Sequence, residues 1–259
     1  NDNVSAHVSK IRNEKSVSRT LGWLTSLLKR EPEFPGFIFG SIEGTNDLHL
    51  RKLSALQTAA LPVDGFVISG ICSGESSEER DNILSTILPL LPDEKCRAIS
   101  SVTSPLDILN AIHHGVDVIQ SDYATVLSNL CYASVFSIPN SRSGLVSSAT
   151  RNIEDWRPKF CPCGTQVAAP SKLNLRDKQF ERDQQPLLIG CTCYTCKHYM
   201  RAYLHHLLNV RELLGNTLLH IHNLHHLNKL VECTRESIYY GSFLVFWKEF
   251  KRSFQGGFQ

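Results

Sequence analysis

The sequence predicts an α/β protein in which a parallel sheet covered by helices precedes a helical segment that binds a metal. Two observations support this prediction. Four short apolar runs alternate with helix-length segments between positions 36 and 119, and three cysteines and one histidine between positions 191 and 222 form a metal-ligand set. Strands that are apolar on both faces are typical of parallel sheets, because helices cover such sheets on each side.

Composition places the chain among ordinary globular proteins. It has 259 residues, of which 42% are hydrophobic and 20% charged, which excludes disordered and fibrous classes. No apolar run has the length of a membrane span, and the first residues do not resemble a signal peptide. The nine cysteines therefore read as reduced thiols, and we expect a cytoplasmic protein. Residues 191–259 hold eight Lys and Arg against four Asp and Glu, a weak sign of nucleic-acid binding.

The helices and strands of the first half are predicted from hydrophobic periodicity and from helix-breaking residues. A helix is predicted over residues 18–28, where apolar residues recur at the spacing of one buried face, and it ends before Pro32. We expect residues 1–16 to form a loop or the frayed start of that helix. The predicted strands are 36–42, 65–71, 97–102 and 116–119, and the predicted helices between them are 48–61, 77–91 and 105–114.

Four strand–helix units leave two architectures open. An eight-stranded (β/α) barrel needs twice as many units, so the sheet is either open or one half of a barrel. The expected domains are residues 1–130 for the strand–helix units, 131–185 for a loop-rich insertion, and 186–259 for a metal-binding helical segment. The insertion has little periodicity, and we expect loop with a short hairpin.

The insertion also contains a second Cys-x-Cys sequence, Cys161-Pro-Cys163. No further pair completes a metal site there, so these two cysteines are interpreted as incidental thiols. The tail over residues 237–250 has the pattern of an aromatic amphipathic helix, and we expect it to pack on the metal-binding segment.

Cys191, Cys193 and Cys196 with His222 form the strongest motif. Three thiolates and one imidazole complete the tetrahedral shell of a structural zinc ion, which leaves no open position for catalysis. The chain must double back to bring His222 to the cysteines, so we predict a helix over 201–208, a turn at 209–210 and a returning helix over 211–237. The alternative is a set of reduced cysteines near a histidine-rich helix. Other histidines lie nearby, at positions 198, 205, 206, 220, 225 and 226.

The motif Cys-x-Cys-x2-Cys-x25-His, with Arg201-Ala-Tyr-Leu-His-His-Leu207 inside it, resembles the zinc signature of the tRNA-guanine transglycosylases. These enzymes exchange the wobble guanine of certain tRNAs for queuine or a precursor. The resemblance implies a TIM (β/α)8 barrel with a zinc-binding helical subdomain, one structural Zn²⁺ per chain, and His222 as the fourth ligand. The four strands resemble the last four of that barrel, so we expect the sequence to be its C-terminal half.

Several positions depart from the pattern of an active transglycosylase. The resemblance places Glu43 where the family has a glutamine that touches the base, whereas Gly70 and Glu75 keep the family's base-pocket sequence. Gln120 stands at the position of the aspartate nucleophile, and Ala124-Thr-Val126 replaces Pro-Thr-Arg. An amide cannot form a glycosyl ester, so we expect no catalytic residue in this chain.

Asp122 offers an alternative nucleophile, because residues two apart in a strand face the same side. Asp117 should face the other side and act as a structural hydrogen-bonding residue.

Loss of the nucleophile together with retention of the zinc signature resembles the accessory-subunit branch of the family. That resemblance implies a heterodimer with a catalytic subunit, tRNA as the shared partner, and a location in the cytoplasm and peripherally on the outer mitochondrial membrane. Two other functions stay open from the residues alone. One is an active transglycosylase that uses Asp122, and the other is a zinc-stabilised interaction module unrelated to tRNA.

Overall fold

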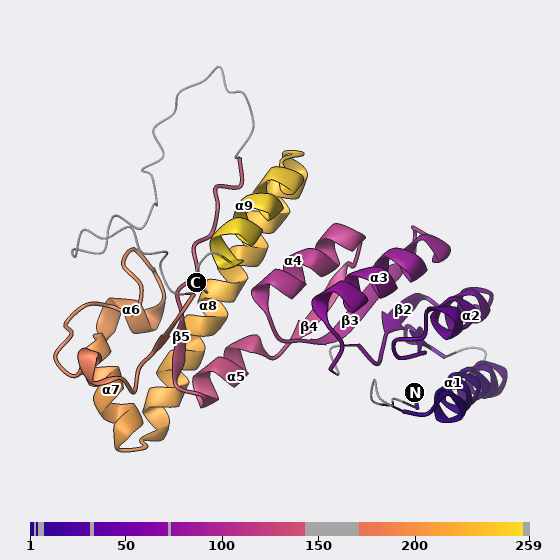
Figure 1. Cartoon of the computed structure of the whole chain (residues 1–259), viewed down its shortest axis with the longest axis horizontal. Coiled ribbons are helices and arrows are strands. Elements are labelled where there is room, and N and C mark those ends of the chain that lie inside the picture. The colour runs from indigo at the N-terminus through magenta and orange to yellow at the C-terminus, as the bar shows by residue number, and fades with distance from the viewer. Residues whose placement is uncertain (3, 5–7, 32–33, 72–73, 143–170, 256–259) are drawn as a thin grey trace. The chain divides into compact units, whose positions relative to one another are not determined.

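The computed structural model describes residues 1–255 apart from positions 3, 5–7, 32–33, 72–73 and 143–170. The chain forms two compact units, Asn1–Asp122 and Tyr123–Gln259, and each is described by itself (Figure 1). Cys161 and Cys163 lie outside the described residues.

The first unit is built on a parallel sheet of four strands in the order β1-β2-β3-β4. Its strands are β1 (Phe39–Ile42), β2 (Gly65–Ile68), β3 (Cys96–Val102) and β4 (Val118–Ser121). All three strand pairings are parallel, so the predicted parallel sheet is confirmed. Strands lie side by side in sequence order when successive strand–helix units cross over with the same handedness.

The helices of this unit are α1 (Lys10–Arg30), α2 (Leu48–Ala59), α3 (Ser77–Ile87), followed by the 3-10 turn η1 (Leu88–Leu90), and α4 (Pro105–His114). The three helices predicted between the strands are thereby confirmed. The first helix begins earlier than predicted, because the Ser9 side chain caps it by accepting a hydrogen bond from the Arg12 backbone N–H. Helix α4 has Pro105 in its first turn and ends at Gly115, whose φ is +96°.

The second unit begins with α5 (Tyr123–Asn129), a helix that the sequence pattern did not predict. Strands β5 (Tyr132–Ser134) and β6 (Lys172–Asn174) pair antiparallel. This ladder joins two segments far apart in the sequence, so it is not the short hairpin expected in the insertion, of which residues 143–170 lie outside the described residues. The remaining elements are η2 (Lys178–Phe180), α6 (Tyr194–His198), α7 (Arg201–Asn209), α8 (Leu213–Tyr239) and α9 (Phe243–Gln255).

The predicted pair of returning helices is confirmed as α7 and α8, with a correction at the turn. Helix α8 begins at Leu213 and not at Arg211, because Arg211 has a φ of +62°. Gly215 allows the two helices to approach closely, since a Cβ there would lie 3.0 Å from Leu208 and 3.1 Å from Leu207. Leu208, Leu218 and Leu219 belong to the core of this unit.

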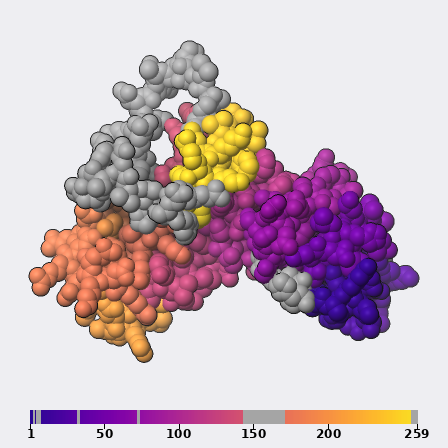
Figure 2. All heavy atoms as spheres, viewed as in Figure 1, coloured from indigo at the N-terminus to yellow at the C-terminus, as the bar shows by residue number. Residues whose placement is uncertain are grey.

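The C-terminal helix also differs from its predicted range. Residues 237–239 belong to α8, and Gly241, with a φ of +71°, ends that helix and separates it from α9. Helix α9 buries Phe246 and Phe250 completely, and Phe250 contacts Phe136 edge to face. Figure 2 shows α9, coloured yellow, on the visible face of the second unit. Within the described residues, no helix has both the length and the apolarity needed to cross a membrane.

Candidate metal centre and strand-end site

Cys191, Cys193, Cys196 and His222 converge, and their ligand atoms all lie within 4.8 Å of one another. The Nδ1 atom of His222 lies 3.7 Å from the Cys191 sulfur, 3.6 Å from the Cys193 sulfur and 3.3 Å from the Cys196 sulfur. A tetrahedral zinc ion with its usual bond lengths would separate sulfur from nitrogen by about 3.6 Å. The donor set and its spacing therefore fit a tetrahedral metal ion.

The knuckle that carries the sulfurs is held by its own backbone and by α8. Cys193 caps α6, and its sulfur accepts a hydrogen bond from the Cys196 backbone N–H at 3.3 Å. Thr195 is fully buried, and its hydroxyl donates to the Leu218 carbonyl of α8 at 2.7 Å. The short helix α6 is thereby fastened to the helix that supplies His222.

His222 is fully buried, and its second ring nitrogen is also used. Nε2 lies 2.9 Å from the Ser134 carbonyl oxygen of β5. A carbonyl only accepts hydrogen bonds, so Nε2 carries the proton and Nδ1 offers its lone pair to the sulfur cluster. Such a partner on the second nitrogen is the usual arrangement of a metal-binding histidine.

Asn223, the residue after His222, is also fully buried and holds β5 against α8. Its Oδ1 accepts from the Ser134 backbone N–H at 2.7 Å, while its Nδ2 donates to the Tyr132 carbonyl at 3.0 Å and to the Ser128 hydroxyl at 3.1 Å. Sequence reasoning missed this residue. Its position beside a ligand was the only signal that could have indicated it.

Hydrogen bonds within the cluster shift its pKa values. Bonds with the Cys191 and Cys196 thiols hold the pKa of Cys193 far below its ordinary value, whereas bonds with Cys191 and Cys193 raise the pKa of Cys196, so the cluster favours the thiolate at Cys193 and the thiol at Cys196. Burial opposes a charged imidazole at His222, but hydrogen bonds with Cys191 and Cys193 raise its pKa to about 9. The raised pKa favours a proton on Nδ1, so the Nδ1 lone pair becomes available to a metal only when that proton is released.

The neighbouring buried histidines have backbone partners of their own. His226 lies 2.9 Å from the Phe136 carbonyl, and burial, with the nearby His222, lowers its pKa to about 4. His205 lies 2.8 Å from the Leu175 carbonyl. His222 is the one histidine of the cluster that the structure groups with the three cysteines.

At the carboxyl ends of β1 and β2, a buried arginine organises the backbone. Arg51 is fully buried, and its guanidinium donates four hydrogen bonds to carbonyl oxygens. The acceptors are the carbonyls of Thr45, Ile42, Ser69 and Gly70, at distances from 2.6 to 2.9 Å. Burial lowers the pKa of Arg51 to about 10, so it stays charged at neutral pH. This second missed residue fixes the loops in which Glu43 and Gly70 lie.

Glu43 lies at this end of the sheet with an exposed fraction of 1%. The Ser41 hydroxyl donates to its Oε1 at 3.0 Å, and the Ser41 and Ser69 hydroxyls lie 2.7 Å apart. Its other oxygen, Oε2, is buried and has no hydrogen-bond partner among the described residues. Burial raises the pKa of Glu43, which favours the neutral acid.

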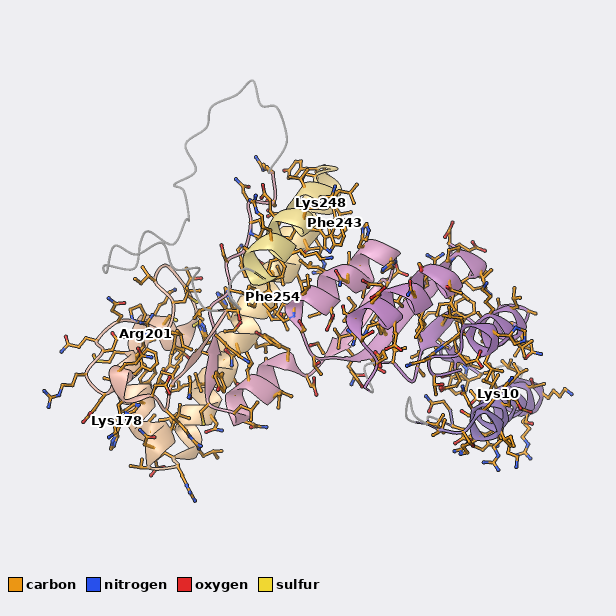
Figure 3. The ribbon with its side chains drawn as sticks, viewed as in Figure 1. Lys10, Lys178, Arg201, Phe243, Lys248 and Phe254 are labelled. Atoms are coloured by element: carbon orange, nitrogen blue, oxygen red, sulfur yellow. The ribbon has the colours of Figure 1, made fainter. Side chains whose placement is uncertain are left out.

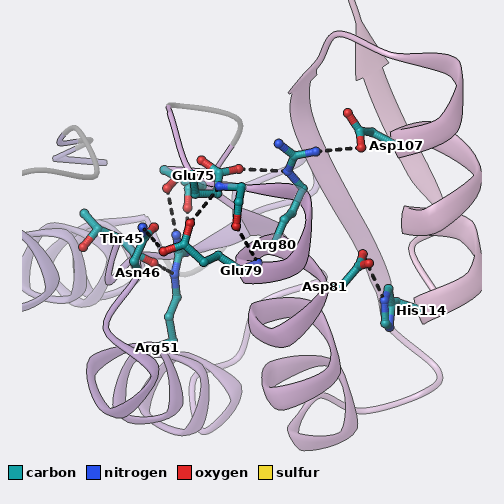
Figure 4. A network of polar contacts seen from close by, with 12 residues as sticks. Thr45, Asn46, Arg51, Glu75, Glu79, Arg80, Asp81, Asp107 and His114 are labelled. Carbon is teal, nitrogen blue, oxygen red and sulfur yellow. Dashed lines mark hydrogen bonds and ion pairs between the residues drawn. The ribbon is translucent and has the colours of Figure 1, made fainter. Parts of the chain in front are cut away.

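Glu75 belongs to an ion-pair network that Figure 4 shows from close by. Arg80 of α3 bridges Glu75 and Asp107 of α4, with both contacts at 2.8 Å. His114 contacts Asp81 at 3.4 Å. These pairs join α3 to α4 and hold the loop that follows β2.

Gln120 is exposed in β4, and Asp122, the residue after the end of that strand, is exposed as well. Asp117 accepts a hydrogen bond from the Arg97 backbone N–H at 2.9 Å, so its predicted hydrogen-bonding role is confirmed. Ala124 and Val126 lie in α5, outside the sheet.

Comparisons with known proteins agree with the motif. The family model described as queuine tRNA-ribosyltransferase matches residues 1–256. A chicken (Gallus gallus) protein named queuine tRNA-ribosyltransferase accessory subunit 2 is 34% identical over 92% of this chain and 59% of its own length. The human (Homo sapiens) protein of that name is 34% identical over 88% of this chain and 58% of its own length.

A bacterial relative is about as similar. The Thermus thermophilus protein named queuine tRNA-ribosyltransferase is 33% identical over 92% of this chain and 54% of its own length. The chain therefore spans somewhat more than half the length of these curated relatives. A family match over nearly all of its residues shows that the chain belongs to the queuine tRNA-ribosyltransferase family.

Proposed function

We propose that the chain belongs to a non-catalytic accessory subunit of a heterodimeric queuine tRNA-ribosyltransferase. The catalytic subunit would exchange guanine for queuine at the wobble position of tRNAs with GUN anticodons, and this chain would help to hold the tRNA. The observation that carries the proposal is Gln120, an amide at the exposed end of β4 where the family's nucleophile is expected. An amide cannot form the covalent ribosyl intermediate.

The names of two relatives support this assignment, because the chicken and human proteins are called accessory subunits. Identity alone does not separate the roles, since the bacterial relative has a similar identity. The amide at position 120 favours the accessory role over the catalytic one. Membership of the family argues against an interaction module unrelated to tRNA.

Asp122 gives the second candidate function, an active transglycosylase, because it is exposed and directly follows the strand that carries Gln120. Two residues along a strand correspond to roughly 6–7 Å, whereas catalytic groups tolerate displacements of only about 0.5 Å. The accessory role is therefore preferred.

The parallel sheet supports a further proposal, that these strands form the C-terminal half of a (β/α)8 barrel. Strands β1 and β4 each have one strand neighbour among the described residues, and a closed barrel would pair both edges. In this proposal residues 1–130 include the barrel half, 131–185 the insertion and 186–259 the zinc segment. Helix α5 packs with the second unit.

Cys191, Cys193, Cys196 and His222 would hold one structural Zn²⁺. Four protein ligands complete its coordination, so the metal would supply folding energy to the second unit and no chemistry. By resemblance to the family, we place the complex in the cytoplasm and peripherally on the outer mitochondrial membrane.

The decisive experiment measures guanine exchange on a wobble-guanosine tRNA with the full-length protein alone, the catalytic subunit alone, and the two mixed. The accessory role requires activity only in the mixture. Activity of this protein alone, lost in Asp122→Asn, would replace the accessory role with the Asp122 mechanism. Gln120→Asp alone should not create activity, because the Pro-Thr-Arg sequence is also absent.

A further inference from the structure

The turn between α7 and α8 contains an arginine whose backbone conformation is rare for this residue type. Arg211 has a φ of +62°, in the left-handed region that L-residues other than Asn, Asp and Gly rarely adopt. Its side chain is exposed, and no hydrogen bond or ion pair of its guanidinium is seen within the described part of the chain. The conformation ends α7, because the Glu212 backbone N–H donates to the Leu207 carbonyl at 2.9 Å across the turn, and glycine is the usual residue at such a position.

Arg211 lines a surface pocket of about 220 Å³ together with Arg176, Leu208 and Asn209. Leu208 is buried and gives the pocket an apolar wall. The Asn209 amide is occupied, because its Nδ2 lies 2.9 Å from the His205 Nε2 atom. The two guanidiniums therefore give the pocket its charge.

Arg176, the second arginine that lines the pocket, lies in the turn after β6. Its backbone N–H donates to the Asn174 side-chain oxygen at 3.2 Å. The Asn174 amide in turn donates to the neighbouring Asp177 carboxylate at 2.8 Å. In the described ranges, the Arg176 guanidinium also has no acidic partner.

The segments that supply the pocket carry more basic than acidic residues. Residues 171–212 contain seven Lys and Arg, at positions 172, 176, 178, 182, 197, 201 and 211, against four acidic residues, at 177, 181, 183 and 212. One of these acids is neutralised, because Asp183 pairs with Arg201 at 2.9 Å. Figure 3 labels Lys178 and Arg201 on this part of the second unit.

We propose that Arg176 and Arg211 bind a backbone phosphate of tRNA at the turn between α7 and α8. Arg176 and Arg211 line the same pocket, and planar guanidinium groups match the oxygens of a phosphate group. The inference rests on the proposed function, which supplies the RNA. Such a contact would position the tRNA without reading its sequence.

The test measures binding of fluorescein-labelled tRNA by fluorescence anisotropy over a series of KCl concentrations, with the full-length protein in complex with the catalytic subunit. The variant Arg176→Gln/Arg211→Gln is compared with Arg182→Gln/Arg235→Gln, which removes the same charge from two exposed arginines outside the pocket. The pocket variant should weaken binding about tenfold and reduce the salt slope by about one. Equal losses in the two variants would overturn the phosphate site.

Arg211→Gly separates a binding role from a structural one. Glycine relieves the strained backbone, so the melting temperature should rise by about 2 °C, while tRNA binding should weaken. A lower melting temperature with unchanged tRNA binding would assign Arg211 to the fold and overturn the proposal.

Two further measurements test whether the pocket binds something other than tRNA. If inorganic phosphate binding depends on the two arginines while tRNA binding does not, the site takes free phosphate and the RNA assignment is wrong. If the pocket variant loses the catalytic subunit, the pocket is a protein interface and the assignment is again wrong. Absence of tRNA binding by the wild-type complex would reject the proposed function together with this site.

Discussion

His222 links the three-cysteine cluster to strand β5, because its Nε2 lies 2.9 Å from the Ser134 carbonyl oxygen while its Nδ1 faces the three sulfurs. Metal binding and docking of β5 on α8 thus involve one imidazole. Asn223 completes this arrangement by binding the Ser134 N–H. We therefore expect the metal to stabilise strand β5 as well as the helices.

Cys193→Ala should remove the bound zinc and destabilise the second unit, because three donors hold a structural zinc ion far less tightly than four. The measurement is zinc content by mass spectrometry together with thermal unfolding. Cys233→Ala is the matched control, since Cys233 is a free thiol of α8 outside the cluster, and it should keep one zinc per chain. Stoichiometric zinc in Cys193→Ala would contradict the ligand assignment.

Asn223→Ala should lower the free energy of unfolding by about 3 kcal/mol, because it leaves buried hydrogen-bonding groups of β5 and α5 without partners. Urea unfolding measures this loss. With Co²⁺ in place of zinc, the visible spectrum should report weaker metal binding, since β5 no longer fixes the His222 ring. Asn216→Ala is the control, because that side chain makes one bond of 3.3 Å to the Ser128 carbonyl. Equal effects in both variants would contradict the role of Asn223 in holding β5 against α8.

Arg51→Met should cost about 3–5 kcal/mol, because four carbonyl oxygens at the ends of β1 and β2 lose a charged donor that is fully buried. Chemical denaturation of the full-length protein measures the change. The neighbouring Lys52 is exposed, so Lys52→Met should alter stability by less than about 0.5 kcal/mol. A loss of that small size in Arg51→Met would show that the loops hold their shape without the guanidinium.

Glu43→Gln should stabilise the protein at neutral pH, because burial raises the pKa of Glu43 above the ordinary value of 4.5. The folded state then holds the proton more tightly than the unfolded state. Its contribution is fully present below the unfolded pKa and is lost as pH rises through the folded pKa. Urea unfolding at pH 4 and pH 7 should show the variant's advantage only at the higher pH. An advantage of the same size at both values would place the effect in packing and not in ionisation.

The sequence alone predicted most of the local elements and the candidate metal ligands of this protein, although it did not predict α5. Alternation of apolar runs with helical segments predicts the four parallel strands, since such strands need cover on both faces. The spacing of Cys191, Cys193 and Cys196 predicts a metal-binding knuckle, because a short chelate loop brings its own donors together. Predicting these three ligands requires no information about contacts between distant residues.

Tertiary structure decided what depends on contacts between distant residues. Arg51 acts through carbonyl oxygens of two strand ends, and Asn223 acts through β5 and α5, so no local pattern reveals either. The sequence likewise does not indicate the left-handed conformation of Arg211, which lies in the turn where α7 and α8 approach closely at Gly215. Spacing along the chain specifies which groups are available, whereas burial and long-range hydrogen bonds determine which of them organise the sites.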